Sequence, residues 1–182
     1  DKALDALRAD MTVPVAARAM LDQWDQTSGK DPIEYAREMK STEEELYRAL
    51  VVANLITIHQ KTSIGRLSAF CGAVSAGAGA GAGIAWLKGA DAKGVAHTVA
   101  NAIAITGGIV CDGAKASCAA KIASAVEAGI LGMEMYQNGS QFLGGDGIVS
   151  KGVENTIRNV GKLARDGMSG TDKEIIRIML GE

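Results

Sequence analysis

The sequence has few aromatic and few proline residues, and these two shortages set limits on its core and its loops. Aromatic residues make up 4% of the 182 residues, so a core must be built from small and aliphatic side chains. Only two prolines stand against 23 glycines. The glycines lie inside apolar stretches rather than polar ones, which indicates close backbone packing and not disordered linkers.

The sequence also lacks a block of charge of one sign. Its formal net charge is -2, without the basic patch that binding to nucleic acid or to an anionic membrane requires. We therefore expect small-molecule ligands, with no nucleic-acid and no membrane partner. Three cysteines are an odd number, without the density of a disulfide scaffold and without a preceding apolar leader, so we expect a reducing compartment, the cytoplasm.

A membrane-spanning helix is not expected either. The run from Ala69 to Leu87 carries no charge, but it consists mainly of glycine and alanine, which gain little on entering lipid. This composition favours a buried helix in contact with other helices. A chain of this length is expected to form one domain with one substantial core.

Helical patterns follow one another along the chain. A capping-box pattern at residues 41–45 opens a helix that continues to about Gln60, and no segment outside the Gly/Ala run shows clean strand alternation. We therefore predict an all-α fold, a compact multi-helix bundle around a Gly/Ala-rich central helix. Residues 1–182 form a single domain, with 1–40 as a peripheral helical segment and 41–182 as the cysteine-bearing catalytic core. Further helices are expected over residues 95–105, 116–136, 150–165 and 175–180.

Gly77, Gly79, Gly81 and Gly83 alternate with alanines in the predicted central helix. A period of two is also typical of a glycine-rich loop or a silk-like strand. Helix is our preferred interpretation, but each glycine costs a helix about 1 kcal/mol relative to alanine. Neighbouring helices must therefore pack tightly against the bare backbone.

Three cysteines are the main candidates for chemistry. Cys111 and Cys118 are seven residues apart, which on a helix is two turns and one face, and Cys71 comes from a separate element. Three thiolates can hold an iron-sulfur cluster by three corners and leave one iron open for substrate. Two alternatives remain at this point: three small buried hydrophobic residues, or a zinc site that takes a fourth ligand from His59 or His97.

Two polar loops flank the cysteines. Lys61 to Arg66 precede Cys71 and Asp112 to Lys115 follow Cys111, and either loop has the groups to clamp a carboxylate, although solvated helix ends are an equal alternative. His59 is the better candidate for acid-base chemistry, whereas His97 lies in an apolar segment typical of a core histidine. No strand precedes the Gly/Ala run, which argues against a nucleotide-binding loop.

Two segments are similar to a known family: KTSIGRLSAFCG at residues 61–72 and GGIVCDGAKASC at residues 107–118. Together they closely resemble the L-cysteine desulfidase family, which is related to the alpha chain of the iron-sulfur L-serine dehydratases. The similarity runs from about Glu44 to the C-terminus, whose sequence GKLARDGMSGTDKEIIRIMLG also resembles the end of that family. Family members are about twice as long, which implies that an N-terminal half of the full-length enzyme lies outside this chain.

The resemblance implies an activity and a set of site residues. The expected reaction is a β-elimination at a 4Fe-4S cluster, without pyridoxal phosphate. L-cysteine would give pyruvate, ammonia and sulfide, and L-serine would give pyruvate, ammonia and water. The expected partners are the amino-acid substrate, the missing N-terminal half or subunit, and further copies of the chain in a homo-oligomer. The alternative is an inactive homologue that serves as a small amino-acid-binding or structural helical module. The resemblance implies that Cys71, Cys111 and Cys118 are the cluster ligands. It implies that Lys61, Ser63 and Arg66 bind the substrate carboxylate, and that Asp112 and Lys115 surround the cluster. His59 is the acid-base candidate, and Asn101 is a further polar contact with the substrate.

Overall fold

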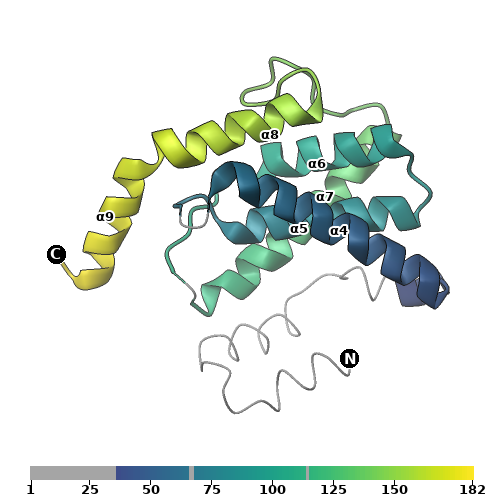
Figure 1. Ribbon diagram of the computed structural model, residues 1–182, viewed down its shortest axis with the longest axis horizontal. Helices are drawn as coiled ribbons and strands as arrows, with labels where there is room; N and C mark the ends of the chain where they lie inside the picture. Colours follow the sequence, from purple (N-terminus) through teal and green to yellow (C-terminus); the bar gives the residue numbers. More distant parts are fainter. Residues whose placement is uncertain (1–35, 66–67, 114) are drawn as a thin grey trace, which may run out of the picture.

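The computed structural model describes residues 36–65, 68–113 and 115–182. Every regular element in these ranges is helical, which confirms the all-α prediction there (Figure 1). Most of the expected peripheral segment 1–40 lies outside the described residues, as does Arg66. The elements are α4 Glu43–Ile64, α5 Gly72–Leu87, α6 Ala92–Thr106, α7 Ser117–Gln137, α8 Val153–Lys162, the π-helical turn η1 Leu163–Gly167, and α9 Ser169–Leu180.

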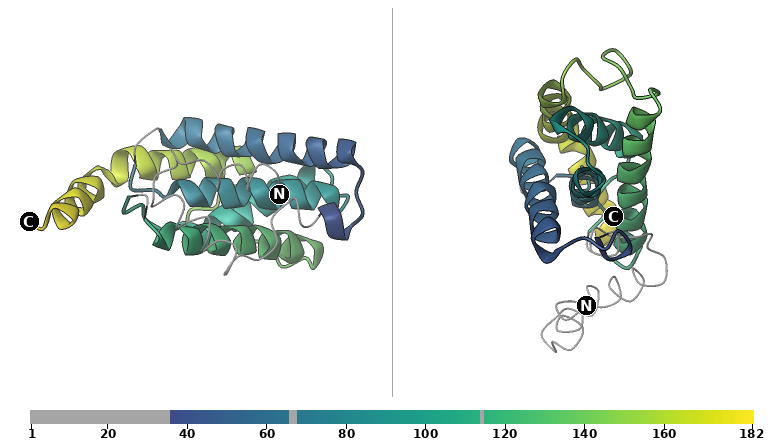
Figure 2. Two further views of the ribbon diagram at one scale, coloured as in Figure 1. Left: turned by 90° about the horizontal axis from the view of Figure 1, so that it is seen from below. Right: turned by 90° about the vertical axis from the view of Figure 1, so that its right-hand side faces the viewer.

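The Gly/Ala-rich helix α5 is the centre of the bundle. It packs against α4, α6 and α7, and the right-hand view of Figure 2 shows it end-on between them. The residues of α5 from Val74 to Ala85 are almost all buried. The predicted central helix is therefore confirmed, and α8, η1 and α9 follow along one side and past one end of the bundle (Figure 1).

The alternating glycines of α5 serve two opposite faces of one helix. A Cβ added at Gly77 would lie 2.3 Å from the Ala125 Cβ of α7, and one added at Gly81 would lie 2.5 Å from the Gly129 Cα. A Cβ added at Gly79 would instead lie 2.5 Å from the carbonyl oxygen of Ala53 in α4. Positions four apart lie on the same helix face, whereas positions two apart lie on nearly opposite faces. The alternating glycines thus form two stripes on opposite faces of α5. Gly77 and Gly81 let α7 approach closely, and Gly79 and Gly83 let α4 approach closely.

Helix boundaries follow local capping chemistry. Thr42 and Glu45 form the predicted capping box, because the Thr42 side chain accepts from the Glu45 N–H and Glu45 accepts from the Thr42 N–H. The helix runs four residues beyond the predicted end at Gln60 and stops at Gly65, whose φ of 98° favours glycine. The predicted start of the last helix at Ile175 was wrong, since α9 begins at Ser169 and continues directly from η1.

The core reaches the end of the bundle where α4 stops and α5 starts. Its largest members there are Ile64, Phe70 and Val74, and Cys71 lies among them. Partly buried side chains of Ile109 and Cys111 pack against the same cluster. The chain segments that carry two of the three cysteines are therefore anchored in the core. Within the part of the chain described, no helix has the length and apolar character needed to cross a membrane.

Candidate functional site

Two short extended segments place Cys71 and Cys111 beside each other. Phe70 and Val110 form an isolated antiparallel bridge, in which the Cys71 N–H donates to the Ile109 carbonyl at 3.3 Å and the Cys111 N–H donates to the Ala69 carbonyl at 2.7 Å. Side chains alternate between the two faces of paired extended chains. Phe70 and Val110 therefore share one face of the bridge, and Cys71 and Cys111 share the other.

Cys118 reaches the same region from the first turn of α7. Its thiol donates to the Gly113 carbonyl oxygen at 3.2 Å, in the loop that follows Cys111. The interpretation of Cys111 and Cys118 as two turns of one helix was wrong, because α7 begins only at Ser117 and Cys111 is extended.

Lys121 holds the Cys111 loop against α7. Its ammonium donates to the Val110 carbonyl at 3.1 Å and forms an ion pair with Asp112, and its side chain is four-fifths buried. The hydrogen bond from Lys121 lowers the pKa of the Asp112 carboxyl, and the carboxylate in turn raises the pKa of Lys121. Sequence reasoning missed this residue. Lys121 follows Cys118 by three residues, which places both on the same face of a helix. This spacing was the sequence signal that could have identified it.

The thiol of Cys71 is the most buried of the three. Burial raises its pKa above the usual value, the Ala73 backbone N–H opposes that shift, and the negative charges of Cys111 and Cys118 raise the pKa further. The positive charge of Lys121 acts in the opposite direction and lowers the pKa of Cys71. One turn along α5 from Cys71, the hydroxyl of Ser75 is fully buried and is a polar atom without a hydrogen-bond partner in the described structure.

Three cysteine thiols are the sulfur donors that this region offers to a metal centre. No three side chains of the His, Cys, Asp and Glu types are near enough, among the residues placed by the structure, to enclose one metal ion. Zinc at about 2.3 Å from each sulfur requires such a close set. A cluster of several iron atoms is larger than one ion and holds its thiolates farther apart. Three thiols from two facing loops and the start of α7 are a suitable donor set for it.

Lys61 lies beside a hollow on the outer side of α4. The hollow has a volume of about 430 Å³ and is lined by Thr57, Ile58, Lys61, Thr62 and Gly65. Lys61 is half-buried in its wall, at the end of α4 that adjoins the cysteine loops (Figure 1). Of Lys61 and Ser63, the two described residues that were predicted to bind a carboxylate, Lys61 lines this hollow and Ser63 does not.

Ser63 and His59 face a different element, α8. The Ser63 carbonyl accepts a hydrogen bond from Arg165, and the backbone and Cβ of Ser63 lie against Gly161. His59 Nε2 lies 2.8 Å from a carboxylate oxygen of Glu154. These contacts attach α8 to α4, so the structure does not bring Ser63 and His59 into the hollow beside Lys61. Lys115 is exposed in the loop before α7.

Asn101 is placed in the interior, where both ends of its amide are bonded. Its Nδ2 donates to the Gly132 carbonyl at 2.8 Å, and its Oδ1 accepts from the Phe142 N–H at 3.0 Å. The side chain thus connects α6 to α7 and to the loop after α7. This arrangement leaves no free amide atom for a substrate.

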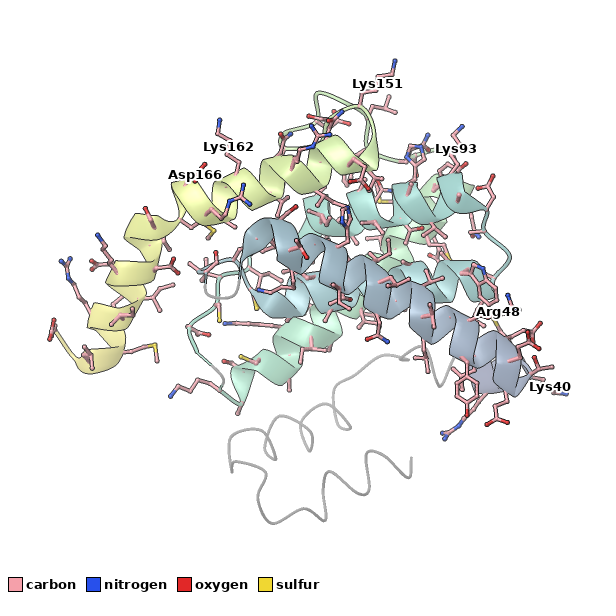
Figure 3. The ribbon with its side chains drawn as sticks, in the orientation of Figure 1. Lys40, Arg48, Lys93, Lys151, Lys162 and Asp166 are labelled. Atoms are coloured by element: carbon pink, nitrogen blue, oxygen red, sulfur yellow. The ribbon has the colours of Figure 1, made fainter. Side chains whose placement is uncertain are left out.

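A second hollow lies between α6, the loop after α7 and the start of α8. Its volume is about 500 Å³, and its wall includes His97 of α6, which stacks on Tyr136 with ring centroids 4.8 Å apart. Lys93 and Lys151 also line it and extend outward at its edge (Figure 3). None of the three cysteines lines this hollow or the hollow beside Lys61.

Comparison with known proteins identifies the family. The family described as serine dehydratase alpha chain matches residues 32–177 of this chain. The chain belongs to the serine dehydratase alpha chain family. The match includes both segments that carry the cysteines, and it confirms the relation that those segments suggested.

Relatives of this serine dehydratase alpha chain domain match between 80% and 98% of its length. A UPF0597 protein of Desulfitobacterium hafniense is 59% identical over 98% of this chain and 41% of its own length. UPF0597 proteins of Treponema denticola and Lachnoclostridium phytofermentans are 51% and 52% identical over 80% and 81% of this chain, and over 34% and 36% of their own lengths. The chain thus spans about two-fifths of the length of the curated relatives that it matches. No solved structure matches it.

The serine dehydratase alpha chain match also includes Lys121, which the sequence interpretation had omitted. Within the matched range, the structure gathers the three cysteines, Asp112 and Lys121 at one end of the bundle, where α4 ends and α5 and α7 begin. This end is the candidate functional site of the domain.

Proposed function

We propose that this domain is the cysteine-bearing part of an iron-sulfur lyase that removes the β-substituent of L-cysteine or L-serine. The observation that supports the proposal is the approach of three thiols from three segments, with Cys71 and Cys111 on one face of the antiparallel bridge and Cys118 bonded to the loop between. Membership of the serine dehydratase alpha chain family agrees with this chemistry.

Cys71, Cys111 and Cys118 would hold the cluster, a 4Fe-4S centre with one iron left open. When bound, the cluster supplies a Lewis acid that weakens the bond between the β-carbon and its sulfur or oxygen. Lys121 supports the ligands from outside, since it fixes the Cys111 loop and adds a positive charge near the thiolates. Ser75 offers a buried hydroxyl close to Cys71 as a donor to a bound group.

Substrate binding is assigned to the Lys61 side of the site. The Lys61 ammonium binds the amino-acid carboxylate through a charge-assisted hydrogen bond, which holds the α-carbon in a fixed position. A general base takes the α-proton, the bond from the β-carbon breaks, and sulfide or hydroxide leaves with the bonding electrons. The resulting aminoacrylate tautomerises to an imine, and water hydrolyses the imine to pyruvate and ammonium.

The test is an anaerobic assay of the full-length protein, with sulfide release from L-cysteine and pyruvate release from L-serine measured side by side. Turnover of either substrate is expected in the wild type, and its loss is expected in Cys111→Ser. Lys61→Gln is expected to raise KM by about ten- to a hundredfold, since a hydrogen bond to a charged group contributes about 1.5–3 kcal/mol. Lys93→Gln, in the second hollow, is the matched control and should leave KM unchanged.

Two outcomes contradict the proposal. If Cys111→Ser turned over substrate at the wild-type rate, the reaction would not depend on this cysteine. A raised KM in Lys93→Gln with none in Lys61→Gln would place the substrate in the hollow beside His97 instead.

A further inference from the structure

Helix α4 has two apolar faces, and only one of them is covered. One face packs against α5 through Ala49, Ala53 and Thr57, where the bare glycines of α5 approach. The opposite face carries four large side chains at helical spacing, each 56–60% exposed, which we call the α4 stripe: Tyr47, Val51, Leu55 and Ile58. A helix at the surface of a monomer normally presents polar residues outward, whereas a helix that is apolar on both sides is normally buried.

Helix α4 itself lies at the periphery of the bundle. Both views of Figure 2 place α4 along an outer edge of the bundle, with α5 on its inner side. Lys40 and Arg48 lie at the N-terminal end of α4 (Figure 3), and Arg48 is paired with Glu44 there. The middle of the outer face is therefore free of charge among the described residues.

Polar side chains next to the α4 stripe are bonded to their own helix. Asn54 Nδ2 donates to the Leu50 carbonyl at 2.7 Å, and Thr62 Oγ1 donates to the Ile58 carbonyl at 2.9 Å. An apolar partner could cover these groups without leaving the bonded donors unpaired, which lowers the cost of desolvation. The stripe also continues into the site, because Ile58 lines the same hollow as Lys61.

The comparisons point to an occupant for this face. The segment shared with the Desulfitobacterium relative is 98% of this chain but only 41% of that protein, so most of the relative lies outside the shared segment. We propose that the α4 stripe is the docking surface for an uncharged apolar surface of that remaining part of the full-length protein. Docking there covers Leu55 and Ile58 and closes the open side of the Lys61 hollow.

Binding between the two parts tests this directly. This chain is co-expressed with the part of the Desulfitobacterium relative outside the 178 matched residues, and the complex is measured by co-purification and sedimentation. Leu55→Glu is expected to weaken the complex at least tenfold. Leu131→Glu is the matched control, since it is a leucine on another helix, α7, with 49% exposure, and it should bind as the wild type does. The helical content and melting of both variants confirm that they fold.

A second measurement uses a fusion of the two parts, in which co-expression is not needed. Cysteine is introduced as Leu55→Cys or Leu131→Cys, and maleimide labelling of each peptide is followed by mass spectrometry. Protection of position 55 with continued labelling of position 131 is the expected result. Docking requires neither a cluster nor turnover, so these measurements succeed or fail separately from the proposed reaction.

Three results would overturn the proposal: equal binding by Leu55→Glu and wild type, full labelling of position 55 in the fusion, or a dimer of this chain alone that Leu55→Glu dissociates. The last result would assign the stripe to a second copy.

Discussion

A single methyl group added at Gly81 tests whether helix packing explains the glycine pattern of α5. A Cβ at this position would lie 2.5 Å from the Gly129 Cα and 2.9 Å from the Gly129 carbonyl carbon. Both atoms are backbone, so no side chain can rotate away, and α5 and α7 must separate. Overpacking of a core costs about 1–3 kcal/mol, and a backbone contact belongs at the upper end of that range.

Helix propensity opposes this cost, since alanine is about 1 kcal/mol better than glycine in a helix. The net expectation for Gly81→Ala is therefore a loss of about 2 kcal/mol in the free energy of unfolding. For a domain of this size, that loss lowers Tm by about 4–8 °C. Urea unfolding followed by circular dichroism measures the free energy, and a thermal scan gives Tm.

Gly72→Ala is the control in the same helix, because no atom lies within 4 Å of a Cβ added there. It is expected to be neutral or slightly stabilising. Equal stability of Gly81→Ala and Gly72→Ala would refute the packing explanation, since the close backbone contact exists only at Gly81.

Three other substitutions probe the supports of the site and the bundle. Asn101→Ala should lower the free energy of unfolding by about 2–3 kcal/mol in urea titrations, because the buried Gly132 carbonyl and the partly buried Phe142 N–H lose their partner. An unchanged value would contradict the structural role of Asn101. Lys121→Met should speed hydrogen exchange of the backbone amides in residues 109–113, because the bonds from Lys121 to Val110 and Asp112 are lost. Lys121→Arg should keep the exchange near the wild-type rate. Equal exchange in all three proteins would show that Lys121 does not hold this loop in place. Thr42→Ala should cost about 1 kcal/mol through loss of the capping box, whereas Ser41→Ala should cost little.

Local chemistry in the sequence was sufficient to predict most of the helices. The capping box at Thr42 and the apolar spacing after it depend on residues within a few turns, so α4 was recognisable. The Gly/Ala run was ambiguous between strand and helix until the structure showed which neighbours its two stripes meet, α4 and α7. That choice depends on contacts between α5 and segments tens of residues away in the chain, which periodicity does not contain.

The site was predicted less completely because its geometry depends on long-range pairing. The bridge between Phe70 and Val110 sets the relation of Cys71 to Cys111, and spacing along the chain carried no sign of it. The seven-residue spacing suggested that Cys111 and Cys118 share one helix face, but Cys111 is extended and only Cys118 belongs to α7. Lys121 resembles any surface lysine in a sequence, and only its bonds to Val110 and Asp112 distinguish it.

Asn101 was predicted as a ligand contact, but the structure gives it a packing role. A polar residue in an apolar helix is a reasonable candidate for ligand contact, but here the amide satisfies backbone groups of Gly132 and Phe142. Its burial is a packing requirement of three segments that meet only in the folded bundle.

Anaerobic reconstitution with iron and sulfide tests most directly whether the three thiols share one inorganic centre. The account predicts a brown protein with about four iron atoms per chain, and a clear loss of bound iron and of the iron-thiolate absorption in Cys71→Ser and in Cys111→Ser. A wild-type chain that binds no iron, or serine variants that bind as much as the wild type, would contradict it.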